Sequence, residues 1–182
     1  MITKGRFRSI RIGCASVVGA LLLLFMAAVI FPYPILSGSV WVSSHIILAY
    51  KAVQREIDIR GILPKAEGGD SNAQARLAWL YHLRHTEAGN RESVKWAEKG
   101  AVQGSIEAMT LLADHYACGD GAEKSLSVAA KWYLAAAERG DVASQYYVSR
   151  MYGKGIGVAT NQQAAAYWWK KVEKAMAECR AC

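Results

Sequence analysis

The first part of the chain is dominated by one long apolar run. Residues 12–31 read IGCASVVGALLLLFMAAVIF, and no Asp, Glu, Lys or Arg occurs between Ile12 and Tyr50. At about 1.5 Å per residue, 20 helical residues span roughly 30 Å, the thickness of the hydrocarbon core of a bilayer. The pattern therefore predicts a transmembrane helix or signal-anchor over 12–31, followed by a linker over 32–43 that contains Pro, Gly and Ser.

The charges before this run predict its orientation. Residues 1–11 contain four basic residues and no acidic one, so the positive-inside rule makes them a cytoplasmic segment. The rest of the chain is then exported and, in a bacterium, lies in the periplasm beside the inner membrane. A cleaved signal peptide is the alternative, since the small residues at 37–39 could serve a peptidase, although the apolar run is long and no clean Ala-x-Ala follows it. Both interpretations export the remainder of the chain.

Beyond the linker, apolar residues recur at helical spacing. They fall three and four positions apart at Ile46, Tyr50, Val53 and Ile57. This stripe predicts a helix within 44–65. We expect that region to lead into the following domain and to cap it.

A pattern of about 36 residues then repeats three times. Its aromatic positions are Tyr81, Tyr116 and Tyr152, followed by Trp96, Trp132 and Trp168. A Leu or Val precedes each of these tyrosines by four residues, a small residue by eight and a Gly by twelve. Such spacing predicts helix–turn–helix units over 66–103, 104–139 and 140–175, with a tail over 176–182. One hairpin cannot bury its own apolar face, whereas three stacked hairpins form a continuous core.

Glycines mark the ends of these predicted helices. Gly104 and Gly140 fall where the second helices end, a position that favours a left-handed residue. The pairs Gly119/Gly121 and Gly155/Gly157 fall in the turn between the two helices of a repeat.

The frame Gly…Ala…Leu-small…Tyr-x-x-Gly-x-Gly…Ala-x-x-Trp resembles the Sel-one-like repeat (SLR), a relative of the tetratricopeptide repeat. The third copy matches it best, whereas the first copy has Arg84 and Thr86 in place of the loop glycines and a loop one residue shorter. The resemblance covers about residues 66–175. It implies an all-α fold, a short right-handed α-solenoid, in which the first helices line a concave groove, and a role as an adaptor for other proteins.

The net charge of +7 suggests nucleic-acid binding until its distribution is considered. Four of the basic residues belong to the N-terminal cluster, and the chain after Tyr50 has 18 basic and 15 acidic residues, a balance of +3. We therefore expect no nucleic-acid partner. The sequence also lacks a Gly-x-Ser-x-Gly elbow, a phosphate-binding Gly-Lys-Ser/Thr loop and a His-Glu-x-x-His motif, so neither an enzyme nor a cofactor is expected.

Two groups of side chains could carry other chemistry. A zinc site could draw on His82, His85, His115 and Cys118, because stacked repeats bring equivalent helix ends together. Solvated or partly buried histidines are the commoner outcome, so no metal is assigned. In an oxidising compartment Cys179 and Cys182 could form a local disulfide, one of them could pair with Cys118, or the thiols could stay reduced.

The concave face that the resemblance implies gives the candidate partner site. Its residues lie opposite the core stripe of the first helices: Asn72, Trp79, His82, Glu107, Thr110, Asp114, Tyr146 and Arg150. The alternative is an ordinary solvated face, with Trp79 packed against a neighbour or against the capping helix. The favoured hypothesis is a membrane-anchored periplasmic adaptor that binds another protein in this groove. The alternatives are an immunity protein that neutralises a toxic effector delivered to the periplasm, and a β-lactam-binding or hydrolysing relative, whose regular cysteine pairs this chain lacks.

Overall fold

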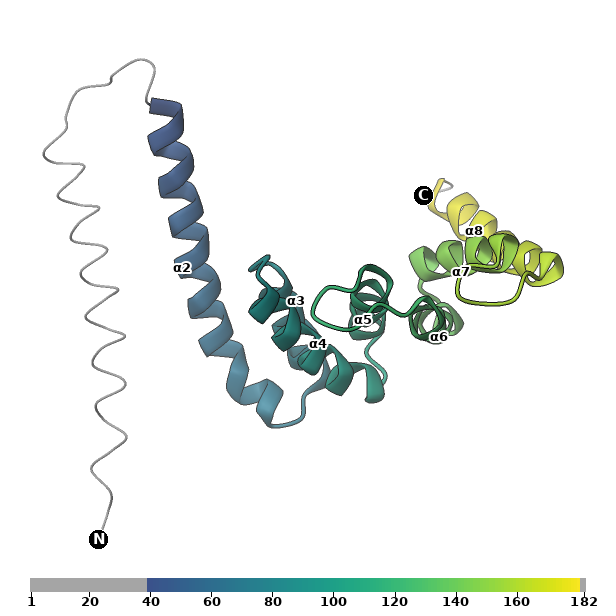
Figure 1. Ribbon diagram of the computed structural model, residues 1–182, viewed down its shortest axis with the longest axis horizontal. Helices are drawn as coiled ribbons and strands as arrows, with labels where there is room; N and C mark the ends of the chain where they lie inside the picture. The colour runs from purple at the N-terminus through teal and green to yellow at the C-terminus, as the bar shows by residue number, and fades with distance from the viewer. Residues whose placement is uncertain (1–38, 181–182) are drawn as a thin grey trace, which may run out of the picture. The chain divides into compact units, whose positions relative to one another are not determined.

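The computed structural model describes residues 39–180, with side chains over 46–179. Within this part of the chain it contains only α-helices and no strand, which confirms the all-α expectation. They are α2 (Ser39–Glu67), α3 (Ser71–His82), α4 (Glu87–Val102), α5 (Ile106–Cys118), α6 (Leu126–Glu138), α7 (Val142–Lys154) and α8 (Gln162–Arg180) (Figure 1). The chain divides into two compact units, residues 1–49 and 50–182, and all the repeat helices belong to the second.

Three of the predicted segments differ from the observed elements. Helix α2 begins at Ser39, inside the expected linker, because the prolines of that linker all precede the helix and serines are tolerated within it. It also runs past residue 65 to Glu67, with Pro64 inside its last turn. At the C-terminal end, α8 continues to Arg180, so residues 176–180 of the expected tail are helical. The segments 1–11 and 12–31 lie outside the described residues. None of the described helices is long and apolar enough to cross a membrane.

Each repeat is joined to the next by a Gly followed by a capping residue. Gly104 takes a φ of +95°, and the N–H of the next residue, Ser105, donates to the Gly100 carbonyl at 3.0 Å, which closes the end of α4. The hydroxyl of Ser105 then accepts from the N–H of Ala108 and so starts α5. The same stop-and-start occurs at Gly140 and Asp141, as the glycine pattern predicts.

The turns inside the second and third repeats hold the stack together. A Cβ on Gly157 would lie 2.2 Å from the carbonyl oxygen of Leu126, the first residue of α6. A Cβ on Gly121 would lie 2.4 Å from the carbonyl carbon of Asn90 in α4. Each glycine turn therefore lies directly on the second helix of the preceding repeat, and only Gly allows so close an approach.

The turn of the first repeat differs from the other two. It lacks the loop glycines, and His85 takes the positive φ of 50° instead. Its turn contacts α2 through an ion pair between Arg84 and Glu56, 2.5 Å apart. Ile59 and Ala66 of α2 are buried in the same core cluster as the first repeat, so the second half of α2 covers this end of the stack.

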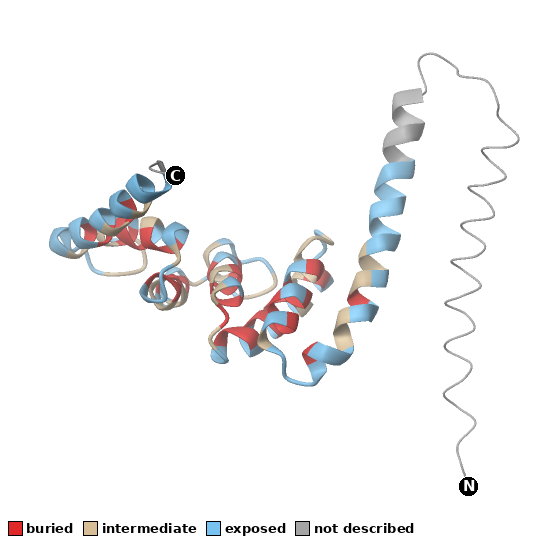
Figure 2. Cartoon of the chain, turned by 180° about the vertical axis from the view of Figure 1, so that it is seen from behind, coloured by how far each residue is buried: buried red, intermediate tan, exposed pale blue. Residues whose placement is uncertain are grey.

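The core follows the predicted stripe. Leu77 and Leu112 are fully buried and Val148 nearly so, and the neighbouring Ala78 and Ala113 have no exposed surface. Helices pack in the pairs α3–α4, α5–α6 and α7–α8, and adjacent pairs contact through α4–α5, α6–α7 and α3–α5. Figure 2 shows buried residues along α3 to α8, whereas the first half of α2 is exposed where its side chains are described. Small residues beside each large one let the helices approach closely.

Candidate functional site

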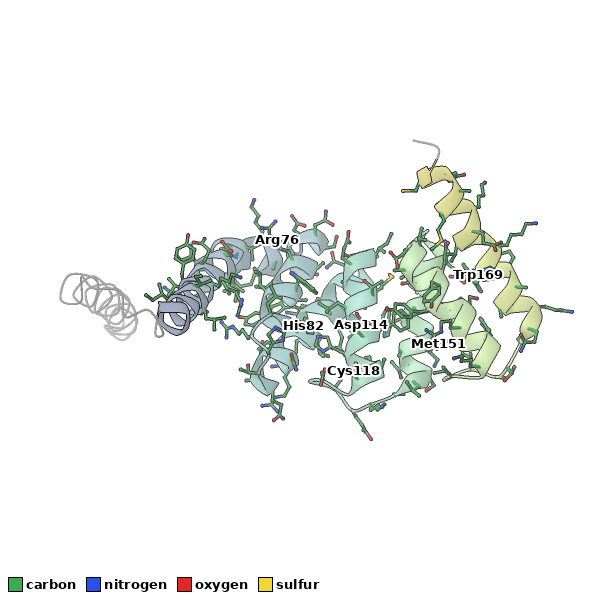
Figure 3. All side chains as sticks on the ribbon, turned by 90° about the horizontal axis from the view of Figure 1, so that it is seen from above. Arg76, His82, Asp114, Cys118, Met151 and Trp169 are labelled. Atoms are coloured by element: carbon green, nitrogen blue, oxygen red, sulfur yellow. The ribbon has the colours of Figure 1, made fainter. Side chains whose placement is uncertain are left out.

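A cavity lies between α3 and α5. It has a volume of about 570 Å³ and is lined by Asn72, Ala75, Arg76, Trp79, Glu107, Thr110, Leu111 and Asp114. We call this cavity the α3–α5 groove. Five of the eight predicted partner-binding residues line it, and Figure 3 labels Arg76 and Asp114 on its two helices.

The repeat itself explains why these residues meet. On each helix the lining positions are separated by three, four and seven residues, which places them on one face. Positions 35 residues apart are equivalent in adjacent repeats, so Asn72 corresponds to Glu107 and Trp79 to Asp114. Because α3 and α5 contact each other directly, these equivalent positions form the two walls of one groove.

Trp79 is the large apolar side chain of the groove. It is 52% exposed, although its ring also stacks on His82 with 5.5 Å between ring centroids and 27° between the planes. Trp79 therefore packs against a neighbour on its own helix and still presents half of its surface, and its role in partner binding stays a prediction. Predicted partner residue His82 lies beside Trp79 and does not line the groove.

Asp114 has a fixed orientation. The phenol of Tyr133 on α6 donates a short hydrogen bond to its Oδ1. Burial, and then this hydrogen bond, raise the pKa of Tyr133, so the phenol stays protonated and remains a donor. Asp114 is exposed as a residue, and its Oδ2 has no hydrogen-bond partner among the described residues. Glu107 accepts a hydrogen bond from the Ser105 hydroxyl at 3.1 Å.

The two predicted partner residues on α7 lie outside the groove. The guanidinium of Arg150 lies 5.7 Å from the ring centre of Tyr146, and Tyr146 contacts Tyr147 and Trp169 at ring distances of 5.9 and 6.2 Å. Tyr147 in turn lies 5.0 Å from Tyr133. These aromatic rings link α6, α7 and α8, and through Tyr133 they reach Asp114 at the edge of the groove.

Among the described side chains, the candidate zinc ligands are not arranged as a metal centre. His115 is 1% exposed, and its Nδ1 lies 2.6 Å from the carbonyl oxygen of Asp120, which can only accept, so Nδ1 carries the proton. Its Nε2 lies 2.8 Å from the Ser93 hydroxyl and accepts from it. Both nitrogens are therefore used, and burial lowers the pKa of His115. His82 lies 5.2 Å from His115 and 5.9 Å from His85, ring centre to ring centre. Among the described residues no three His, Cys, Asp or Glu side chains are grouped to hold a metal ion.

The cysteines give no further chemistry in the described part of the chain. Cys118 and Cys179 are both exposed and free. Cys182 lies outside the described residues, so a Cys179–Cys182 disulfide stays a prediction.

Three residues of the groove were not among the predicted partner-binding residues, although they lie at the same helical spacing. Arg76 lies four residues after Asn72 and three before Trp79, so the helical face alone places it in the groove. Ala75 and Leu111 form the apolar lining and are found by the same rule. The bonds of Tyr133 with Asp114 and of Ser93 with His115 join residues 19 and 22 apart on different helices, and no local pattern signals them.

Taken together, the helices, glycine turns and groove define an all-helical repeat protein that presents a lined groove on its first helices. Comparison with known families identifies it further. The Sel1 repeat model matches residues 71–105, 106–141 and 142–171. The chain belongs to the Sel1 repeat family, as the SLR resemblance implies. Sel1 repeats generally mediate protein binding and are usually non-catalytic, so the class is that of interaction scaffolds.

Two solved structures show the same arrangement. A Sel1 repeat protein from Oxalobacter formigenes is similar at 29% identity and a TM-score of 0.59, over 64% of this chain and 89% of that one. A protective antigen with an SLR fold, present in uropathogenic Escherichia coli strains, is similar at 32% identity and a TM-score of 0.60. The match covers 64% of this chain but only 25% of that antigen. A search of curated proteins found no match.

Proposed function

We propose that this protein is a membrane-anchored adaptor whose repeat domain holds a segment of another protein in the α3–α5 groove. The observation that carries the proposal is the groove itself, a cavity of about 570 Å³ lined by both apolar and charged side chains. In this proposal the protein binds its partner and catalyses no reaction.

The lining has the composition of a recognition site. Ala75 and Leu111 give it an apolar floor, and Trp79 offers a half-exposed aromatic ring. Large aromatic side chains that become buried on binding supply much of the energy at protein interfaces, and a few polar groups at the rim set the orientation of the partner. The groove is open along two helices, which suits a polypeptide segment.

The proposal of a membrane anchor rests on the sequence. The apolar run over 12–31, preceded by four basic residues, supports a cytoplasmic N-terminus and a periplasmic repeat domain. Attachment to the membrane would raise the effective concentration of the adaptor near membrane-bound partners. A C-terminal alkaline phosphatase fusion tests this topology, because the enzyme is active only when exported. We expect activity, and an inactive, stable fusion would overturn the periplasmic location.

Site-specific photocrosslinking tests the groove. We would replace Asn72, which is exposed and lines the groove, with benzoylphenylalanine in the full chain and irradiate the cells that naturally produce it. The matched control carries the same residue at Val102, which is 80% exposed and lies outside the groove. We expect a discrete protein adduct at position 72 and none at 102. No adduct at 72, or equal adducts at both positions, would overturn the proposal.

A further inference from the structure

The charges along the α3–α5 groove are unevenly distributed. Its α5 wall contributes the carboxylates of Glu107 and Asp114, and its α3 wall contributes one base, Arg76. No ion pair within the described residues includes any of the three. The lining therefore has two acidic side chains and one basic side chain, a net charge of −1.

The end of the groove that holds Trp79 and Asp114 brings one of these carboxylates and an aromatic ring into the same lining. The two residues are equivalent in adjacent repeats, and both line the groove, Trp79 from α3 and Asp114 from α5. One part of the indole rests on His82, and half of the side chain is exposed. An aromatic face attracts a cation, and a carboxylate within reach of the same cation adds a charge-assisted hydrogen bond.

The Asp114 carboxylate is held in place before any ligand arrives. Tyr133 donates to its Oδ1, and Oδ2 has no hydrogen-bond partner among the described residues. Tyr133 is itself buried and packs on Tyr147, which fixes the donor. A carboxylate that is already oriented loses little entropy when it binds a cation. Arg76 lies one helical turn before Trp79, level with Leu111, and so leaves this end of the groove acidic.

We propose that the groove recognises a basic side chain of its partner, an Arg or Lys that lies between the Trp79 ring and the Asp114 carboxylate. This inference rests on the proposed function and names the chemistry of the partner segment. Glu107, at the other end of the groove, extends the negative potential toward a second basic residue, and the apolar floor accepts the intervening side chain. An acidic segment would meet two carboxylates and only one base.

Selection from a random peptide library tests the proposal. The full chain in lipid nanodiscs is panned against phage-displayed random 12-residue peptides, with empty nanodiscs as the background. The variants are Asp114→Asn, Asp114→Arg and Trp79→Ala. The matched control is Glu123→Gln, which removes an exposed acidic residue outside the groove. We expect wild type and Glu123→Gln to select peptides rich in Arg or Lys, and Asp114→Arg to select acidic ones.

A second measurement separates contact from general attraction. The best wild-type peptide is compared by fluorescence polarisation with a copy in which citrulline or norleucine replaces the basic residue. We expect the neutral copy to bind wild type about ten-fold more weakly, and to bind Asp114→Asn as well as the basic peptide does. Tyr133→Phe should lose part of this discrimination while its helical circular dichroism is unchanged, because it only positions the carboxylate.

The outcomes distinguish this inference from the function on which it rests. Peptides that depend on Trp79 but have no basic residue, or an equal loss from the neutral substitution in wild type and Asp114→Asn, would overturn the basic-residue proposal alone. If no peptide is enriched over empty nanodiscs, or if binding is the same in Trp79→Ala, both proposals fail.

Discussion

The turn of the third repeat lies so close to the second repeat that Gly157 has no room for a side chain. A Cβ there would lie 2.2 Å from the carbonyl oxygen and 2.5 Å from the carbonyl carbon of Leu126. Both atoms are backbone, so no rotation of a flexible side chain can relieve the overlap. We expect Gly157→Ala to force the third repeat away from α6 and to destabilise the whole stack.

The size of the effect follows from two contributions. An Ala held in the left-handed region costs about 1–2 kcal/mol. Overpacking against a fixed neighbour adds about 1–3 kcal/mol. The sum lowers the free energy of unfolding by about 2–5 kcal/mol.

Gly140→Ala is the matched control. Gly140 also has a positive φ, of +98°, but a Cβ there would meet nothing within 4 Å. Its φ lies further from the left-handed minimum near +57° than the +69° of Gly157. If backbone strain alone mattered, Gly140→Ala would be the more harmful change. We expect the opposite order, because a Cβ at position 157 overlaps the backbone of α6 whereas one at position 140 meets nothing.

Urea unfolding of the full chain, followed by circular dichroism at 222 nm, measures the difference. We expect Gly157→Ala to be less stable than Gly140→Ala by about 1–3 kcal/mol. Gly61→Ala, on an open face of helix α2, should instead increase stability by about 0.5–1 kcal/mol. If Gly157→Ala is no less stable than Gly140→Ala, the glycine turns do not set the spacing of the repeats.

Three further changes test other parts of the molecule in the same unfolding assay. Leu112→Ala, at a fully buried site, should lower the free energy of unfolding by about 2–5 kcal/mol, whereas Val102→Ala on the surface should change it little. Asp141→Ala removes the carboxylate that accepts from the N–H of Ser144 at 2.6 Å and should cost about 1 kcal/mol; no loss would mean that this cap is dispensable. Because burial lowers the pKa of His115, the unfolded chain binds its proton more readily, so the stability it contributes is present above about pH 6.5 and is lost as the pH falls through the lowered pKa. Wild type should therefore lose more stability than His115→Gln between pH 7 and pH 5, and equal losses would contradict this assignment.

Much of the fold is encoded locally and could be predicted. Gly104 followed by Ser105 stops one helix and starts the next through hydrogen bonds within a few residues, so the boundary is evident from the sequence. The recurring tyrosines and tryptophans likewise give the length of the repeat, because each occupies the equivalent position in every helix pair. The linker was predicted to run to residue 43, because small polar residues and the preceding prolines favour one, but α2 begins at Ser39.

The site was predictable only as far as a helical face defines it. Asn72, Trp79 and Glu107 line the groove because the period of each helix places them there. His115 is different: its sequence spacing from Cys118 suggested a metal ligand, but it is buried against Ser93 from another repeat unit. Contacts of that kind depend on how two helices pack, and no short pattern encodes them.

The central claim is that the α3–α5 groove holds the partner, and the affinity of one pair of variants tests it most directly. The protein crosslinked through position 72 is purified, and its Kd is measured against the full chain by isothermal titration calorimetry. Trp79→Ala is compared with Tyr167→Ala, a 56% exposed aromatic residue of α8 outside the groove. Removing an aromatic residue that is buried on binding costs about 2 kcal/mol or more, or roughly thirty-fold in Kd. We predict that loss for Trp79→Ala and wild-type affinity for Tyr167→Ala; wild-type affinity in Trp79→Ala would contradict the claim.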